Sequence, residues 1–305
     1  MSHLVETMFS AREVPWHGLG TVVPNVLTAQ EAIKAGGLDW DVELRPVYTN
    51  NLKGNRIRIP KAQAIVRDSD EKVLGVVGNK YVPFQNRDAF QFFDNLVDSG
   101  EAKYETAGSL KGGKLVWLTA KLPNHVSLGG VDDVEIYILL WTSHDGTKAI
   151  TVDVTPIRVV CANTLNLAVE RSKRRWSIRH LSTVHSRLGE ARTTLELTFK
   201  YVEAFQTEAE GLLAQPFTER RMSNMLDVLL PNKPRTGTVK GTILENFVEG
   251  PTLDNVRGTK WAALNAVGEY YDHLRAPRTD QSKFMGSWTG VGMKTRQKAL
   301  TLLNN

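Results

Sequence analysis

The chain has 305 residues, 41% of them hydrophobic and 23% charged, a composition that excludes collagen-like, low-complexity and largely disordered proteins. Its length predicts one large domain or two modest ones, with enough residues to bury a sizeable core. Lys and Arg number 38 against 33 Asp and Glu, and the net charge of +5 permits a polyanionic partner without requiring one. The single cysteine, Cys161, excludes an intramolecular disulfide.

The first half of the chain carries patterns typical of β-strands. Residues 38–44 alternate apolar and acidic side chains, and residues 63–67 and 73–77 flank an Asp-Ser-Asp turn, which predicts a hairpin. Residues 86–96 show helical spacing, with Asn86 as the expected N-cap. Further strands, rich in β-branched and aromatic residues, are expected at 104–107, 115–122, 134–141 and 149–154.

The second half changes to a helical period near Ala162. One long amphipathic helix is expected at residues 188–213, followed by helices at 219–230 and 261–274, and the Pro- and Gly-containing stretch 231–238 interrupts this series. Strands followed by helices predict an α+β fold, in which an antiparallel β-rich N-terminal half packs with a helical C-terminal half. We therefore expect a core domain at 1–230, a linker or mobile loop at 231–240 and a helical region at 241–305.

A glycine-rich stretch at residues 108–114 has the G-x4-G-K spacing of a phosphate-binding loop. That motif requires Ser or Thr next and must open a helix, whereas here Leu115 follows and a strand is expected. The stretch therefore predicts a hairpin turn that carries Lys111 and Lys114.

The tetrapeptide Ser143-His144-Asp145-Gly146 places three polar residues of the catalytic-triad types side by side. Triads assemble from residues that are distant in sequence, and Asp-Gly is a strong hairpin signal, so a polar turn is one interpretation. The other is a loop tip from which His144 and Asp145 contact a ligand. Cys161 is expected as a small core residue rather than as a nucleophile, because no nearby base is evident.

Residues 171–192 hold the densest charge in the chain. The segment contains seven basic residues and one acidic residue, so its net charge of +6 exceeds that of the whole chain. Trp176 lies among the basic residues and would stack on an unpaired base, as in proteins that bind single strands. The alternative is a solvated loop in which Trp176 turns inward as an anchor. His180 and His185 have no acidic or Cys partners nearby, so neither a metal nor another cofactor is expected.

Several strings together resemble the "phage/plasmid-like protein" family, an uncharacterised group encoded by bacteriophages and mobile elements. They are the Trp-His-Gly-Leu-Gly of residues 16–20, the glycine-rich 107–113, the 143–146 tetrapeptide and the Arg-Val-Val-Cys-Ala-Asn-Thr-Leu of residues 158–165. The resemblance implies a phage or plasmid gene that acts inside a bacterium. Its architecture is also similar to that of phage single-strand annealing recombinases, which have a β-β-β-α core, form rings or filaments and hold single-stranded DNA in a basic groove.

The leading hypothesis is a phage or plasmid protein that binds or anneals single-stranded DNA in recombination or replication, as a homo-oligomer and without a cofactor. The residues expected to contact nucleic acid are Lys111, Lys114, Arg158, Arg171, Lys173, Arg174, Arg175, Trp176 and Arg179. One alternative is a phage protein that binds a host protein or forms a structural assembly. Another is a metal-assisted hydrolase that uses His144, Asp145 and His180.

The expected location is the cytoplasm of the bacterial host. The N-terminal residues do not show a basic region followed by an apolar one, as a signal peptide does. The apolar runs fall short of the ~18–20 residues that span a bilayer, so no membrane association is expected.

Overall fold

Strands dominate the first half of the chain and helices the second, which confirms the predicted α+β class. The structure is a computed structural model that describes residues 5–11, 21–23, 28–98, 102–158, 175–231, 236–275 and 291–305. Contacts divide the chain into two compact units. One unit comprises Met1–Pro123, Ile138–Val154 and Arg175–Leu195, and the other Asn124–Tyr137, Thr155–Arg174 and Glu196–Asn305.

The larger sheet has seven strands in the order β10-β9-β8-β7-β6-β1-β2. The short β2 is parallel to β1, whereas β1 with β6, β6 with β7 and β9 with β10 are antiparallel. The strands are β1 (Val5–Ser10), β2 (Thr21–Val22), β6 (Lys103–Leu110), β7 (Leu115–Leu128), β8 (Asp132–Ser143), β9 (Ile150–Arg158) and β10 (Arg175–Ile178). Nearly every residue of β8 from Val134 onward is buried, as expected for a central strand.

The smaller sheet has the order β3-β4-β5, with β3 (Val42–Asn50), β4 (Arg56–Arg67) and β5 (Val73–Gly78). The predicted hairpin is confirmed, because β4 and β5 pair from Ala62↔Gly78 to Val66↔Val73. The strand expected at 38–44 begins only at Val42. Leu38 and Trp40 precede it in a turn that the Trp40 indole N–H stabilises by donating to the Gly37 carbonyl at 3.0 Å.

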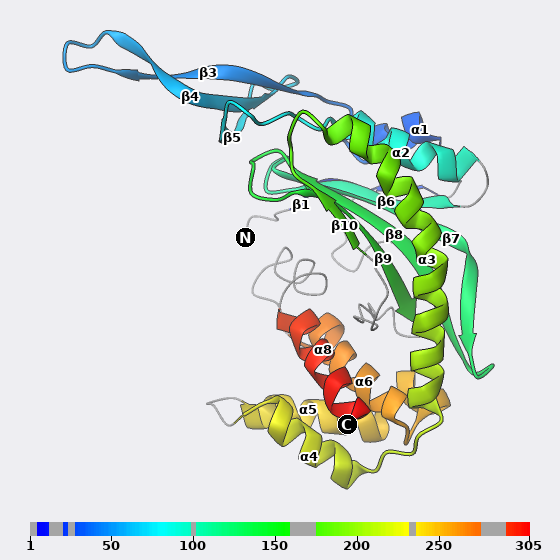
Figure 1. Ribbon diagram of the computed structural model, residues 1–305. Helices are drawn as coiled ribbons and strands as arrows, with labels where there is room; N and C mark the ends of the chain where they lie inside the picture. The colour runs from blue at the N-terminus through cyan, green and yellow to red at the C-terminus, as the bar shows by residue number, and fades with distance from the viewer. Residues whose placement is uncertain are drawn as a thin grey trace. The chain divides into compact units, whose positions relative to one another are not determined.

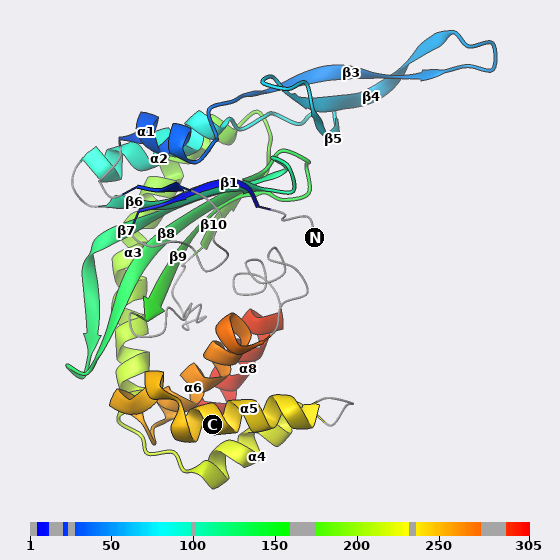
Figure 2. The same cartoon turned by 180° about the vertical axis from the view of Figure 1, so that it is seen from behind.

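Two helices, α1 (Ala29–Ala35) and α2 (Asn86–Asp98), contact each other and strand β6 (Figures 1 and 2). The predicted helix at 86–96 is therefore confirmed, whereas α1 was not expected. Thr28 and Glu31 form a reciprocal capping box at the start of α1.

Asn86 is not the N-cap that the sequence predicted. Its side-chain amide is buried and donates to the carbonyls of Leu38 at 3.0 Å and Trp40 at 3.2 Å. The Asp88 carboxylate instead accepts from the backbone N–H of Gln85, at 2.9 Å, where α2 begins. The reason is tertiary, because the amide ties α2 to the segment before β3.

The chain passes between the two units at several points, one of which lies inside helix α3 (Val184–Leu213). This helix contains the long segment expected at 188–213. The core domain expected at 1–230, the linker at 231–240 and the helical region at 241–305 stay a prediction. Helix α5 (Thr236–Glu249) already begins within the expected linker, and residues 232–235 lie outside the described residues.

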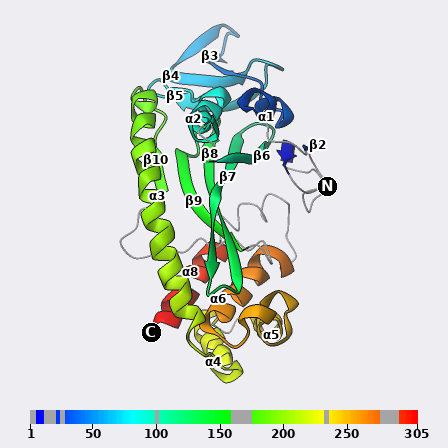
Figure 3. The same cartoon turned by 90° about the vertical axis from the view of Figure 1, so that its right-hand side faces the viewer.

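Helix α6 (Lys260–Glu269) is the centre of the second unit, since all its residues from Trp261 to Glu269 are buried. The Trp261 indole N–H donates to Asp132 at 2.8 Å, and its ring lies 6.2 Å from that of Phe205. The aromatic face expected at 261–274 is thus largely core. Figure 3 shows α6 grouped with α4 (Glu219–Leu229), α5 and α8 (Val291–Asn304). In sequence, α6 is preceded by the 3₁₀-helix η1 (Pro251–Val256) and followed by the π-helical turn η2 (Tyr270–Leu274).

Among the described helices, none is both long and apolar enough to cross a membrane.

Candidate functional site

The Ser143–Gly146 tetrapeptide forms the turn that follows β8, but its histidine belongs to the core. His144 is 0% exposed, its Nε2 lies 2.9 Å from the Asn86 Oδ1, and its ring contacts Trp40 edge-on at 5.1 Å. Burial lowers the pKa of His144 to about 3, so the ring is neutral at pH 7. The expectation that His144 contacts a ligand from a loop tip is therefore wrong.

Asp145 has the opposite environment. Its carboxylate accepts from the backbone N–H and the hydroxyl of Thr147, at 2.9 and 2.6 Å, which closes the turn. Partial burial alone would raise the pKa of this carboxyl, but the hydrogen bonds from Thr147 and Ser143 and the charge of Lys111 lower it overall. Asp145 is therefore a carboxylate at neutral pH, and it is accessible to solvent.

Two glycines bring strand β5 against this turn. A Cβ on Gly75 would lie 2.7 Å from the Asp145 Cα, and a Cβ on Gly146 would lie 2.7 Å from a Val77 methyl. Gly146 also has a φ of +75°, a conformation that favours glycine. The predicted Asp-Gly turn is thus confirmed, and the missing side chains let two backbones that are distant in sequence approach closely.

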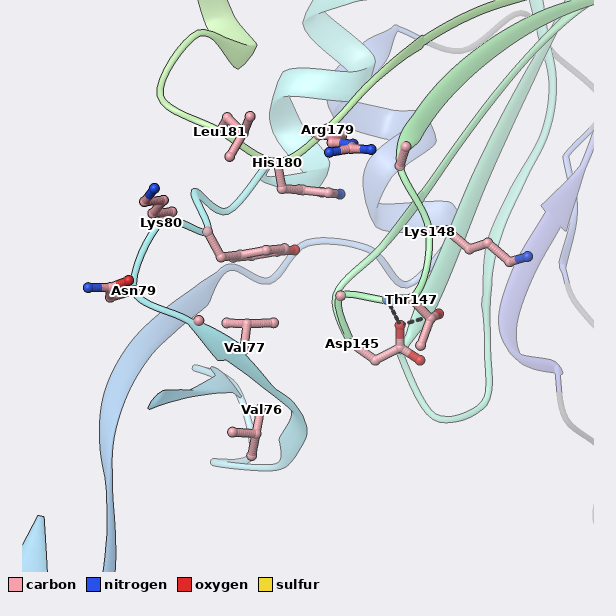
Figure 4. A pocket seen from close by; sticks show the side chains of 14 residues that line it. Val76, Val77, Asn79, Lys80, Asp145, Thr147, Lys148, Arg179, His180 and Leu181 are labelled. Carbon is pink, nitrogen blue, oxygen red and sulfur yellow. Dashed lines mark hydrogen bonds between the residues drawn. The ribbon is translucent and has the colours of Figure 1, made fainter. Parts of the chain in front are cut away.

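A pocket of about 640 Å³ opens beside this contact. It is lined by three segments that are far apart in sequence, residues 76–81, 145–149 and 179–181, and all three belong to the first unit. We call it the Asp145 pocket. In Figure 4, Val77 lies opposite Asp145 and Thr147, and His180 lies above them.

One wall of the Asp145 pocket consists of two stacked rings. Tyr81 and His180 lie 4.7 Å apart with an interplanar angle of 16°, and the Tyr81 hydroxyl donates to the Ser143 carbonyl at 3.1 Å. The His180 Nε2 lies 3.3 Å from the Thr142 hydroxyl, while its buried Nδ1 has no hydrogen-bond partner among the residues that the structure describes. Burial lowers the pKa of His180 to about 4, so this wall is uncharged at pH 7.

The rim of the Asp145 pocket is cationic. Lys80, Lys148 and Arg179 line it, and none of the three forms an ion pair within the part of the chain that the structure describes. Figure 4 shows Lys80 and Lys148 extending on opposite sides. Three cations and the single carboxylate of Asp145 give the lining a net charge of +2. Such a rim attracts anionic groups that lie across the opening.

Of the predicted site residues that the structure describes, Arg179, Asp145 and His180 line this pocket. Arg175 instead pairs with Asp153 on the neighbouring strand β9, its Nε 3.0 Å from a carboxylate oxygen, and lies 5.7 Å over the Trp141 ring. Trp176 is 9% exposed and opposes Val152 in the sheet. The expectation that Trp176 stacks on a base is wrong, and the inward anchor is what the structure shows.

Lys111 and Lys114 lie in the turn between β6 and β7, where Leu110 pairs with Leu115. Lys111 is exposed with a φ of +56°, and the carbonyl of Lys114 accepts from the His144 backbone N–H at 2.8 Å. The predicted hairpin turn is confirmed, and neither lysine lines the Asp145 pocket.

The remaining predicted residues have no described environment. Arg171, Lys173, Arg174, Cys161 and residues 16–20 lie outside the described residues, and Arg158 ends strand β9. Within the described ranges, no group of three His, Cys, Asp or Glu side chains is placed to hold a metal ion.

Sequence reasoning missed Lys80, Tyr81 and Lys148. A signal for two of them was present, because Gly78 and Asn79 mark the end of a predicted strand, and loops at strand ends frequently carry binding residues. Nothing local identifies Lys148, whose role depends on segments that meet only in the fold.

The family model described as "Domain of unknown function (DUF932)" matches residues 73–288. The chain therefore belongs to the DUF932 family. No curated protein and no solved structure matches it. The matched segment contains every residue that lines the Asp145 pocket, and it begins after β4.

Proposed function

We propose that this chain binds single-stranded nucleic acid and that the strand passes over the Asp145 pocket. The observation that supports this proposal is the rim charge: Lys80, Lys148 and Arg179 have no ion-pair partner among the described residues. Cations that neutralise phosphates release condensed counterions, which is the main source of affinity for a polyanion.

The rest of the lining fits the bases rather than the phosphates. Val76, Val77 and Leu181 provide apolar contact area, and the neutral ring pair of Tyr81 and His180 adds a flat wall. The Asp145 carboxylate can accept hydrogen bonds from the amino groups of a base. A volume of about 640 Å³ is within the usual range for small-molecule sites and is large enough for a nucleotide.

We propose further that the protein is encoded by a phage or plasmid and acts on single-stranded DNA in recombination or replication, in the bacterial cytoplasm and without a cofactor. Arg171, Lys173 and Arg174 lie outside the described residues and stay candidates for phosphate contacts from the sequence alone. Several subunits would line up along one strand, since nonspecific single-strand binding is commonly cooperative.

The test is fluorescence anisotropy with a labelled oligonucleotide, measured over a series of salt concentrations. At ~0.7 per phosphate, the three rim cations contribute about −2 to the slope of log affinity against log salt. The variant Lys80→Ala/Lys148→Ala/Arg179→Ala should lose affinity by about tenfold or more and reduce the size of the slope by about 2.

A matched control removes the same charge elsewhere. Lys34, Arg220 and Lys294 are exposed and form no ion pair in the described chain, so Lys34→Ala/Arg220→Ala/Lys294→Ala should keep wild-type affinity within about twofold. Equal losses in the two triple variants, or a wild-type slope near zero, would contradict binding at the Asp145 pocket.

A further inference from the structure

The hairpin of β3 and β4 continues beyond the third strand of its sheet (Figure 1). Strand β5 pairs with β4 only between Ala62 and Val66, whereas β3 and β4 remain paired as far as Asn50↔Arg56. We call residues 46–61 the ribbon arm. At about 3.3 Å per residue, the arm extends roughly 20 Å past the last residue paired to β5. An isolated two-stranded ribbon is marginally stable at best, so its persistence depends on the packed base.

The ribbon arm carries a single sign of charge. It contains four basic residues and no acidic one, a net charge of +4 in 16 positions. The basic residues are Lys53, Arg56, Arg58 and Lys61. None of them forms an ion pair in the described part of the chain. This charge is complementary to a polyanion.

One face of the arm arranges two guanidinium groups around an aromatic ring. Tyr48 is the cross-strand partner of Arg58, and Asn50 is that of Arg56, so the four side chains lie on one face. The Arg56 Cζ lies 3.7 Å from the centroid of the Tyr48 ring. This cation–π contact orients the guanidinium, which leaves its N–H groups free to donate to phosphate oxygens.

The tip of the arm exposes an apolar side chain, that of Leu52, to solvent. The Asn51 Oδ1 accepts from the backbone N–H groups of Lys53 and Asn55, at 3.0 and 2.9 Å, and Gly54 supplies a φ of +81°. This turn fixes the backbone on both sides of Leu52, which is fully exposed. Exposure of a large apolar residue at an ordered tip suits insertion into a partner.

We propose that the ribbon arm binds double-stranded DNA. A two-stranded ribbon has the width to enter a groove of the duplex, where Arg56 and Arg58 contact phosphates and Leu52 lies against a base step. The proposal adds a second ligand at a second surface, and it rests on the proposed function only for the expectation that nucleic acid is the polyanion. The arm precedes the segment matched by the family model, so it is a feature of this chain outside that match.

The experiment compares a labelled duplex with a single strand of equal length by anisotropy, using the full chain. Arg56→Ala/Arg58→Ala should lower duplex affinity by about tenfold or more and reduce the salt slope by about 2, at ~0.9 per phosphate. Its affinity for the single strand should stay within about twofold of wild type. The control Arg220→Ala/Lys294→Ala removes two exposed charges from other elements and should leave both affinities unchanged.

The pocket variant Lys80→Ala/Lys148→Ala/Arg179→Ala separates this proposal from the proposed function. If the proposed function is wrong, the protein will not bind the single strand through the pocket. Duplex binding, and its reduction in Arg56→Ala/Arg58→Ala, can still be measured in that case. Unchanged duplex affinity in the arm variant would overturn the proposal. So would arm-dependent binding to anionic phospholipid vesicles in the absence of duplex binding, which would assign the arm to a membrane surface.

Leu52→Ser tests the insertion at the tip. Energy transfer between dyes at the two duplex ends should report a bend with the wild-type protein and no bend with this variant, while the salt slope stays the same. A bend of equal size in both proteins would overturn the role of Leu52.

Discussion

The base and the ribbon arm of one hairpin use the same kind of residue in opposite ways. At the base, Arg67 is 7% exposed and bonds both Glu6, at 2.9 and 3.0 Å, and Asp70, at 2.6 and 2.8 Å. Along the same strand, Arg56 and Arg58 are exposed and form no ion pair within the described residues. The difference separates cations that hold the fold together from cations that remain free for a partner.

Electrostatics at the base agree with this division. Burial alone would raise the pKa of the Glu6 carboxyl, but the hydrogen bond and charge of Arg67, with smaller contributions from Ser109 and Lys72, lower it overall. The hydrogen bond from Arg67 lowers the pKa of Asp70 to about 2. Both carboxylates are therefore ionised at neutral pH, and the guanidinium that joins them is fixed beside a packed core of Val42, Ile65 and Leu74.

The largest effect is expected at Arg67. Arg67→Met keeps the length of the side chain and removes the charge, which leaves Glu6 and Asp70 without their shared donor. We expect a loss of about 2–3 kcal/mol in the free energy of unfolding, less than for a fully buried pair because both carboxylates retain access to water. Urea unfolding followed by tryptophan fluorescence measures it.

Arg67→Lys is the control for that substitution, because it retains the charge and loses the bidentate geometry. The free energy of unfolding of Arg67→Lys should lie between those of the wild type and Arg67→Met. Equal stability of Arg67→Met and wild type would show that the base does not depend on its paired cation.

Acid should destabilise the base through His144, whose ring contacts Trp40 beside the same core. The folded protein keeps this ring neutral because burial lowers its pKa to about 3, whereas the unfolded chain binds a proton below the ordinary value of 6.5. The unfolded state therefore gains protons first, and stability falls as the pH drops from about 6.5 toward 3. At pH 5 the loss from His144 is about 2 kcal/mol.

Unfolding experiments at pH 7.5 and pH 5 test this expectation. His144→Gln removes the titrating group, so the difference in stability between the two pH values should shrink by about 2 kcal/mol. His125 is exposed in β7, and His125→Gln should keep the full difference. A difference that does not shrink in His144→Gln would assign the acid sensitivity to other groups, of which His180, with a pKa lowered to about 4, is the next.

Local patterns were enough to predict the hairpin of β4 and β5, helix α2 and the glycine-rich turn, because each depends on residues that are close in sequence. The spacing of Thr28 and Glu31 is that of a capping box, so it is a local signal for helix α1 as well. The sequence of strand β10 also contains a local signal for a strand. Arg175 and Ser177 are exposed while Trp176 and Ile178 are buried, a period of two that the charge of the segment obscured.

The candidate site could not be predicted in the same way. The Asp145 pocket joins three segments that are distant in sequence. Within the Ser143–Gly146 turn, His144 is buried in the core whereas Asp145 lines the pocket. His144 enters the core because Asn86, 58 positions earlier, supplies its hydrogen-bond partner.

The smallest effect on stability is expected at Arg58, and it is the most direct test of the comparison. Arg58→Ala removes the same type of side chain from the same strand as a substitution at Arg67, but Arg58 is solvated and its cross-strand neighbour is Tyr48. Exposed cross-strand pairs contribute little, so the free energy of unfolding should fall by about 0.5 kcal/mol or less. The measurement is the same urea titration, with Arg67→Ala as the matched variant. A cost at Arg58 as large as that at Arg67 would mean that the arm is part of the stabilising framework, and its unpaired charge would then need a structural explanation rather than a partner.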